Sequence, residues 1–110
     1  MRMRSGLALT IFAAGFALAG CQQSADPRLK TASPEALQER VRSTCQSTQS
    51  KIQNVSLEKV ARGCGCYAKT TMKSLSPAEL DEFRDTGVFG ESGRNKALQA
   101  LDTCRLKRPT

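Results

Sequence analysis

Apolar side chains recur every three to four positions along most of residues 33–106, a spacing that is typical of amphipathic helices. The first such stretch follows Ser33-Pro34, where serine is a favoured N-cap and proline is tolerated in the first turn. Its apolar stripe consists of Leu37, Val41, Cys45, Thr48 and Ile52. We therefore predict a helix over residues 34–52 that ends at Asn54.

The pattern continues as a second helix that begins after Ser56 and extends to Leu75. One face of this segment is apolar, and the opposite face carries cations. The apolar face is formed by Leu57, Val60, Ala61, Cys64, Ala68, Thr71, Met72 and Leu75. Gly63 and Gly65 each cost about 1 kcal/mol relative to Ala in a helix interior. We expect the helix to survive both glycines, with a kink.

Two shorter helices complete the pattern. The run Ser76-Pro77-Ala78-Glu79 repeats the start signal at Ser33, and it predicts a third helix that ends at Gly87. The loop that follows has one apolar anchor, Phe89, which we expect to turn inward. A fourth helix is predicted over residues 94–106, and its apolar face is formed by Ala97, Leu98, Leu101 and Cys104. Since no segment alternates as a strand does, the predicted fold class is all-α, with four helices.

The first twenty residues have a different pattern. Arg2 and Arg4 precede an apolar run over residues 7–18, as in a secretory signal peptide. This run is shorter than the roughly 20 apolar residues that a membrane-spanning helix needs. It ends in Leu18-Ala19-Gly20-Cys21, which resembles the lipobox of bacterial lipoproteins. The resemblance implies cleavage between Gly20 and Cys21. It also implies a diacylglyceryl thioether and an amide-linked acyl chain, such as palmitate, on Cys21.

The lipobox resemblance implies a location in the bacterial cell envelope. Two or three acyl chains on Cys21 would hold the protein on a membrane, whereas a single chain binds only marginally. In lipoproteins of the enteric type, Asp after the cysteine favours the inner membrane. Gln22 occupies that position here and favours the periplasmic leaflet of the outer membrane, with the inner membrane still open. Apart from the covalent lipid on Cys21, we expect no cofactor.

Residues 22–32 read as a linker, because they are polar, contain Pro27 and lack apolar periodicity. Fully extended, such a linker would reach roughly 35–40 Å. The predicted organisation is therefore a signal peptide over residues 1–20, a lipidated N-terminus and flexible linker over residues 21–32, and a small helical domain over residues 33–110. The whole chain of 110 residues has room for one small domain.

Lipidation of Cys21 leaves four of the five cysteines, Cys45, Cys64, Cys66 and Cys104. An oxidising envelope favours two disulfides among them, each worth roughly 3–4 kcal/mol in the chain-entropy model. Positions two residues apart on a helix differ by about 200° of rotation, so Cys64 and Cys66 are expected to bond to different neighbours. Helical phase favours Cys45–Cys64 with Cys66–Cys104. The opposite pairing, Cys45–Cys66 with Cys64–Cys104, stays open.

The cysteines also suggest a redox site or a metal site. Cys64-Gly65-Cys66 is a candidate redox pair, because Arg62 and Lys69 lie near enough in sequence to lower a thiol pKa. Against it, the chain has no CxxC motif in a thioredoxin-like βαβ context. Structural zinc sites usually need C-x2–4-C pairs, so no metal site is expected. The chain also has no His, which excludes Ser-His-Asp and Cys-His catalytic sites.

The C-x-C motif with its flanking cysteines is also similar to small uncharacterised Cys-rich proteins that proteobacteria secrete. The similarity covers residues 45–104, and it implies no particular function.

The net charge of +7 favours binding to anionic partners. Four cations of the second helix share its polar side: Lys59, Arg62, Lys69 and Lys73. Arg105, Lys107 and Arg108 follow near the C-terminus, where cations suit the end of the last helix. Lipid head groups, lipopolysaccharide phosphates and cell-wall carboxylates are the anionic partners that an envelope offers. Nucleic acid is not expected, given the compartment and the few aromatic residues.

The sequence therefore predicts a membrane-anchored envelope lipoprotein that acts by binding or as a structural accessory, and not as an enzyme. No small-molecule substrate is evident. The alternative is a thiol–disulfide oxidoreductase that uses Cys64-Gly65-Cys66.

Overall fold

A computed structural model describes residues 26–109 of the chain. Its elements in chain order are η1 (Pro27–Thr31), α2 (Pro34–Gln53), η2 (Glu58–Val60), α3 (Ala61–Ser74), α4 (Pro77–Thr86) and α5 (Glu91–Thr103). Over the described residues there are four α-helices and no strand, so the predicted all-α class is confirmed. The lipobox, Cys21 and the expected cleavage site lie outside the described residues.

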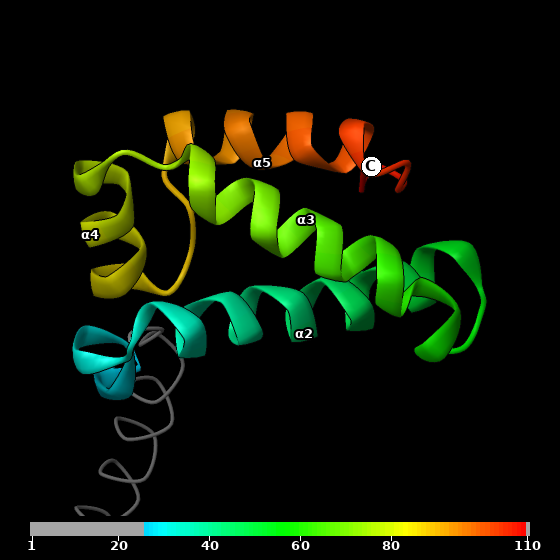
Figure 1. The fold of residues 1–110 in the computed structure, drawn as a ribbon, viewed down its shortest axis with the longest axis horizontal. Helices are drawn as coiled ribbons and strands as arrows, with labels where there is room; N and C mark the ends of the chain where they lie inside the picture. The colour runs from blue at the N-terminus through cyan, green and yellow to red at the C-terminus, as the bar shows by residue number, and fades with distance from the viewer. Residues whose placement is uncertain (1–25, 110) are drawn as a thin grey trace, which may run out of the picture.

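The helix α3 is the centre of the fold (Figure 1). α2 and α3 form an antiparallel hairpin, and α5 lies along the other side of α3. The short helix α4 crosses the end where α3 finishes and α5 begins. Disulfides Cys45–Cys64 and Cys66–Cys104 therefore join the central helix to α2 on one side and to the end of α5 on the other.

Helix boundaries follow the capping residues closely. The Ser33 hydroxyl accepts a hydrogen bond from the Ala36 N–H at 3.1 Å, and Ser76 and Glu79 form a reciprocal capping box. At the other end of α2, Asn54 adopts a left-handed conformation with φ of 58°, which Asn tolerates better than most residues. These start and stop signals are confirmed where the sequence predicted them.

Two helix starts differ from the expectation. The segment after Ser56 first makes the 3-10 turn η2, and the α-helix begins only at Ala61. α5 begins at Glu91 and not at residue 94. In the first turn of α5, buried Gly93 packs beside Leu75 and Phe89, whose side chains lie at ordinary contact distance, 3.4–3.5 Å, from the position of a Cβ. Neither α3 nor α5 has a side-chain cap hydrogen bond at its N-terminus, so local sequence defines these two starts less closely than those at Ser33 and Ser76.

The expected inward turn of Phe89 is confirmed. Its ring stacks on buried Phe83 of α4, with 4.8 Å between ring centroids. The contact ties the loop between α4 and α5 to the main core, which also contains Leu37 and Val41 of α2 and Ala68 of α3.

The expected linker is corrected by the structure. Leu29 in η1 is only 4% exposed and packs into the main core. Arg84 of α4 donates hydrogen bonds to the carbonyl oxygens of Leu29 and Ala32 at 2.9 and 2.8 Å. The folded domain therefore begins by Asp26, and not at residue 33. One buried leucine gives no periodicity, and its partner lies more than 50 residues away, so the sequence pattern could not reveal this contact.

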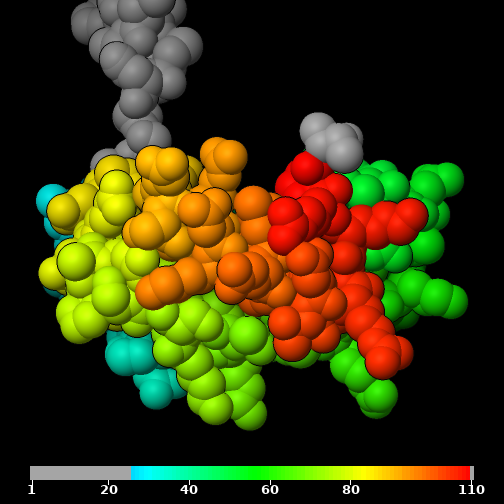
Figure 2. Space-filling view, turned by 90° about the horizontal axis from the view of Figure 1, so that it is seen from above, coloured from blue at the N-terminus to red at the C-terminus, as the bar shows by residue number. Residues whose placement is uncertain are grey.

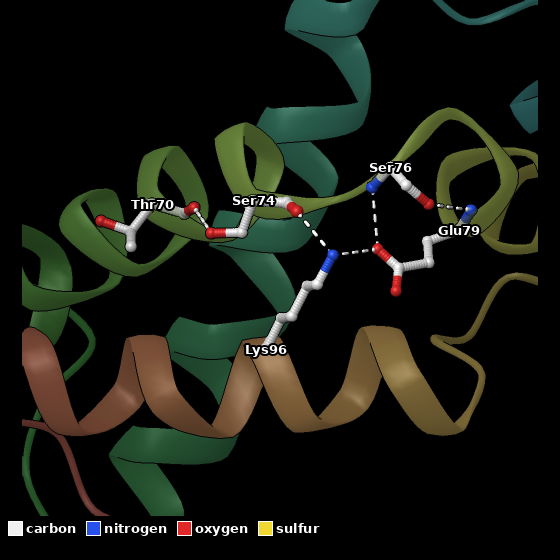
Figure 3. Close-up of polar contacts among 5 residues, drawn as sticks. All are labelled: Thr70, Ser74, Ser76, Glu79 and Lys96. Carbon is white, nitrogen blue, oxygen red and sulfur yellow. Dashed lines mark hydrogen bonds and ion pairs between the residues drawn. The ribbon is translucent and has the colours of Figure 1, made fainter.

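A charged cluster holds the junction of α3, α4 and α5 together (Figure 3). Lys96 of α5 donates to the Ser74 carbonyl at 3.0 Å and to the Glu79 carboxylate at 2.7 Å. The same carboxylate oxygen accepts from the Ser76 N–H at 2.8 Å. Led by the hydrogen bond from Lys96, these contacts lower the pKa of Glu79 to about 2. The cluster stabilises the fold and presents no free reactive group.

Candidate functional site

The four cysteines that follow Cys21 form the two disulfides that helical phase favoured. Cα–Cα distances are 5.5 Å for Cys45–Cys64 and 5.8 Å for Cys66–Cys104, within the usual range for disulfides. The opposite pairing is excluded by this structure. Cys64 and Cys66 are each bonded to a different partner, so Cys64-Gly65-Cys66 forms no bond of its own.

The two disulfides differ in their surroundings. Cys45 and Cys64 are 6% and 0% exposed and lie in a small core cluster with Val60. Cys66 is exposed and Cys104 is half-buried. Solvent and reductants therefore reach the second disulfide much more easily than the first.

The structure divides the predicted basic face into two parts. Lys59 and Arg62 line a groove of about 490 Å³, together with Arg105 from the turn after α5. Lys69 and Lys73 lie farther along α3 and do not line it. We call this hollow the basic groove, and its lining residues are Gln53, Lys59, Val60, Arg62, Gly63, Cys66, Thr103, Cys104, Arg105 and Leu106.

Three features bring the end of α5 against α3 to form the basic groove. The Cys66–Cys104 disulfide joins the two helices directly. Gly63 permits close approach, since a Cβ there would lie 2.7 Å from a methyl carbon of Leu106. Arg105 turns the chain with φ of 61°, a left-handed conformation in which glycine is the usual residue. Figure 2 shows the resulting contact, with the red C-terminal residues beside the green segment that joins α2 to α3.

A buried glutamine also holds the C-terminal segment in place. Gln49 of α2 is 1% exposed. Its amide nitrogen donates to the Lys107 carbonyl at 2.6 Å, and its amide oxygen accepts from the Lys107 N–H at 3.1 Å. Because both polar atoms of the side chain are satisfied, Gln49 is buried without the penalty of an unpaired polar group. It fixes the chain that follows Arg105, and therefore the open side of the basic groove.

The basic groove is positively charged with no acidic residue in its lining. Among the described residues, none of Lys59, Arg62 and Arg105 forms an ion pair. Nearby Asp102 is paired with Arg108 at 2.7 Å, and the hydrogen bond from Arg108 lowers the pKa of the Asp102 carboxyl. Three cations, from η2, α3 and the turn after α5, thus converge on one hollow, an arrangement that attracts anions.

Lys69 and Lys73 are exposed on α3, and within the described chain neither makes an ion pair. They extend the positive surface away from the groove without sharing a hollow.

The contribution of Arg105 is decided by the tertiary structure. In the sequence its only signal is a cation near a helix end, and that signal is shared by Lys107 and Arg108.

A second hollow of about 340 Å³ lies between α2, the loop before α5 and the C-terminal segment. We call it the apolar groove, and its lining residues are Arg40, Val41, Thr44, Cys45, Thr48, Gln49, Tyr67, Phe83, Gly87, Val88, Phe89, Leu101 and Pro109. Burial raises the pKa of the Tyr67 phenol, so its hydroxyl stays protonated. Sequence analysis missed this groove because its walls come from four helices and two loops.

No protein-family model, curated protein or solved structure matches the chain. Within residues 26–109, no helix is both long enough and apolar enough to cross a membrane. The same residues contain no group of three or more His, Cys, Asp or Glu side chains placed to hold a metal ion.

Proposed function

We propose that this chain is a bacterial envelope lipoprotein whose folded domain binds an anionic component of the envelope through the basic groove. The observation that carries the binding proposal is the convergence of Lys59, Arg62 and Arg105 on one hollow without a carboxylate in its lining. The membrane anchor is supported by the lipobox residues Leu18-Ala19-Gly20-Cys21.

Because η1 packs against the core, the proposed tether between the lipid on Cys21 and the folded domain is short. Only residues 22–25 separate a lipid on Cys21 from Asp26, the first residue that the structure describes. Fully extended, that connection spans at most about 18 Å, about half the reach of the expected linker. The proposed lipoprotein would therefore hold its domain close to the membrane surface.

The position of the basic groove favours a partner away from the anchoring membrane. Asp26 lies 3.6 Å from Arg40 of α2, whereas the groove is lined by Gln53, the last residue of α2. From Arg40 to Gln53 the helix rises about 20 Å. The basic groove and Asp26, the first described residue, thus lie toward opposite ends of α2. Of the anionic partners considered, cell-wall carboxylates suit this arrangement better than the head groups of the anchoring membrane.

Intact-mass measurement of membrane-extracted protein tests the anchor. The expected mass lacks residues 1–20, carries acyl groups on Cys21, and is four hydrogens short of the fully reduced chain. An unmodified Cys21 would contradict the lipoprotein proposal.

Cosedimentation with purified peptidoglycan tests the groove. The variant Lys59→Glu/Arg62→Glu is expected to lose most binding, because it reverses two of the three groove cations. The matched control, Lys69→Glu/Lys73→Glu, changes the net charge by the same amount at two positions of α3 outside the groove, and most of its binding should remain. Binding should weaken with salt, since the Debye length falls to about 3 Å at 1 M. Equal losses in the two variants, or no binding by the natural protein, would refute the groove as the site.

The alternative function, a thiol–disulfide oxidoreductase, receives less support. It was based on a Cys64–Cys66 pair, and in this structure Cys64 is buried and bonded to Cys45. Only Cys66–Cys104 is accessible to a redox partner. Insulin reduction by the dithiol form measures this activity directly, with Cys66→Ser/Cys104→Ser as the inactive control.

A further inference from the structure

The apolar groove has the properties of a binding site for a small amphiphile. We propose that it binds a free, unbranched acyl chain whose acidic head group lies against Arg40. Ligand pockets typically occupy about 300–1,000 Å³ and combine apolar walls with a few polar groups. The apolar groove, at about 340 Å³, is at the small end of that range, and this size suits one chain.

The walls of the groove are apolar and well anchored. Val41, Phe83 and Leu101 line it from three different helices, and each is at most 6% exposed. Val88, by contrast, is 61% exposed and belongs to the loop between α4 and α5. It therefore lies at the mouth of the groove, where an entering chain would cover its side chain.

Helix α2 contributes two parallel rows to the groove. Val41 and Cys45 form a buried apolar row, one turn apart. Arg40, Thr44 and Thr48 form a polar row beside it, also with a spacing of four residues. This polar row extends over about 12 Å of the helix. An elongated molecule lying along α2 would meet carbon on one side and polar groups on the other.

A partly exposed cation, Arg40, lies at one end of the polar row. Among the described residues, the closest acidic partner of Arg40 is Asp26, and their 3.6 Å separation is longer than a hydrogen bond. The Arg40 side chain is 41% exposed. Neighbouring Arg42, in contrast, is bonded to Glu39 and Gln46. A guanidinium with open donors pairs well with a carboxylate, so Arg40 selects an acid-headed chain.

The acidic head group also identifies the source of the chain. In a lipoprotein anchor the acyl chains are esters of a glycerol that is thioether-linked to the cysteine, or an amide of its amine, and neither leaves a free carboxylate. A free fatty acid has one. The proposal therefore assigns the groove to a free acid-headed amphiphile, and not to the lipid proposed on Cys21.

Isothermal titration with dodecanoate tests the site, using the chain from residue 21 onward with Cys21→Ser so that no attached lipid can compete. One-to-one binding is expected. Val88→Glu should weaken it at least tenfold, because it places a negative charge at the mouth. Leu57→Glu is the matched control, since Leu57 is 53% exposed and does not line the apolar groove. Its affinity should equal that of the parent.

A second comparison isolates the head group. Dodecanoate should bind more tightly than dodecyltrimethylammonium to the parent, and Arg40→Gln should remove this preference while circular dichroism shows an unchanged helical fold. Absence of saturable binding, equal losses in Val88→Glu and Leu57→Glu, or an unchanged preference in Arg40→Gln would each overturn the proposal. None of these variants alters the basic groove, so the outcome is independent of peptidoglycan binding and of lipidation.

Discussion

The two disulfides offer a direct test of what stabilises this fold. They close loops with sequence separations of 19 residues for Cys45–Cys64 and 38 residues for Cys66–Cys104. In the chain-entropy model these loops are worth about 3.2 and about 3.9 kcal/mol of unfolding free energy. Loop entropy alone therefore predicts that removal of Cys66–Cys104 is the more damaging change.

Burial reverses this order when the cysteines are replaced by serine. Cys45 and Cys64 are almost fully buried, so Cys45→Ser/Cys64→Ser places two hydroxyls in an apolar cluster. Each unsatisfied buried polar group costs about 1–3 kcal/mol, which adds about 2–6 kcal/mol to the loss of the cross-link. Cys66 is exposed, so Cys66→Ser/Cys104→Ser adds little beyond loop entropy. We expect the first double variant to be less stable than the second by about 1–5 kcal/mol.

Urea unfolding followed by far-UV circular dichroism measures this difference, with the slope of free energy against urea as a check on two-state behaviour. If Cys45→Ser/Cys64→Ser is already unfolded in water, the reduction of the natural protein gives a second measurement. Dithiothreitol should then reduce Cys66–Cys104 first, as detected by alkylation and mass mapping. The claim that burial decides the order of stability is refuted if Cys66→Ser/Cys104→Ser is the less stable variant, or if the buried disulfide is reduced first.

Three further predictions concern single side chains. The pKa of Glu79 is about 2 in the folded protein against 4.5 ordinarily. Its contacts therefore add stability above pH 4.5, and this stability is lost as the pH falls toward 2. Glu79→Gln should flatten this part of the stability–pH curve, measured by urea unfolding. Arg84→Ala removes the bonds to η1 and should cost about 1–3 kcal/mol, with faster amide exchange around Leu29; unchanged exchange there would contradict the role given to Arg84. Arg105→Gly relieves the left-handed strain and should stabilise the fold by about 0.5–1 kcal/mol. The same variant should weaken peptidoglycan binding, because it removes a groove cation. If it raised both the stability and the binding, Arg105 would have no part in the groove function.

The sequence by itself determined the helical segments with good accuracy, and it favoured the disulfide pairing that the structure shows while leaving the opposite pairing open. Ser33 and Ser76 cap their helices through residues only three positions away, so these starts depend on local sequence alone. The favoured pairing of Cys45 with Cys64 likewise followed from helical phase, which depends only on the regular rise and rotation of an α-helix.

Tertiary structure alone decided the position of η1 and the composition of both grooves. Leu29 is buried against core residues from three helices, and Arg84 binds its carbonyl from 55 residues away in the sequence. Arg105 joins Lys59 because a disulfide and a glycine bring α5 against α3. Periodicity reports which side of a helix is apolar, but not which other helix covers it. The contacts that make both candidate sites form between residues distant in sequence, and for this reason they became visible only in the folded chain.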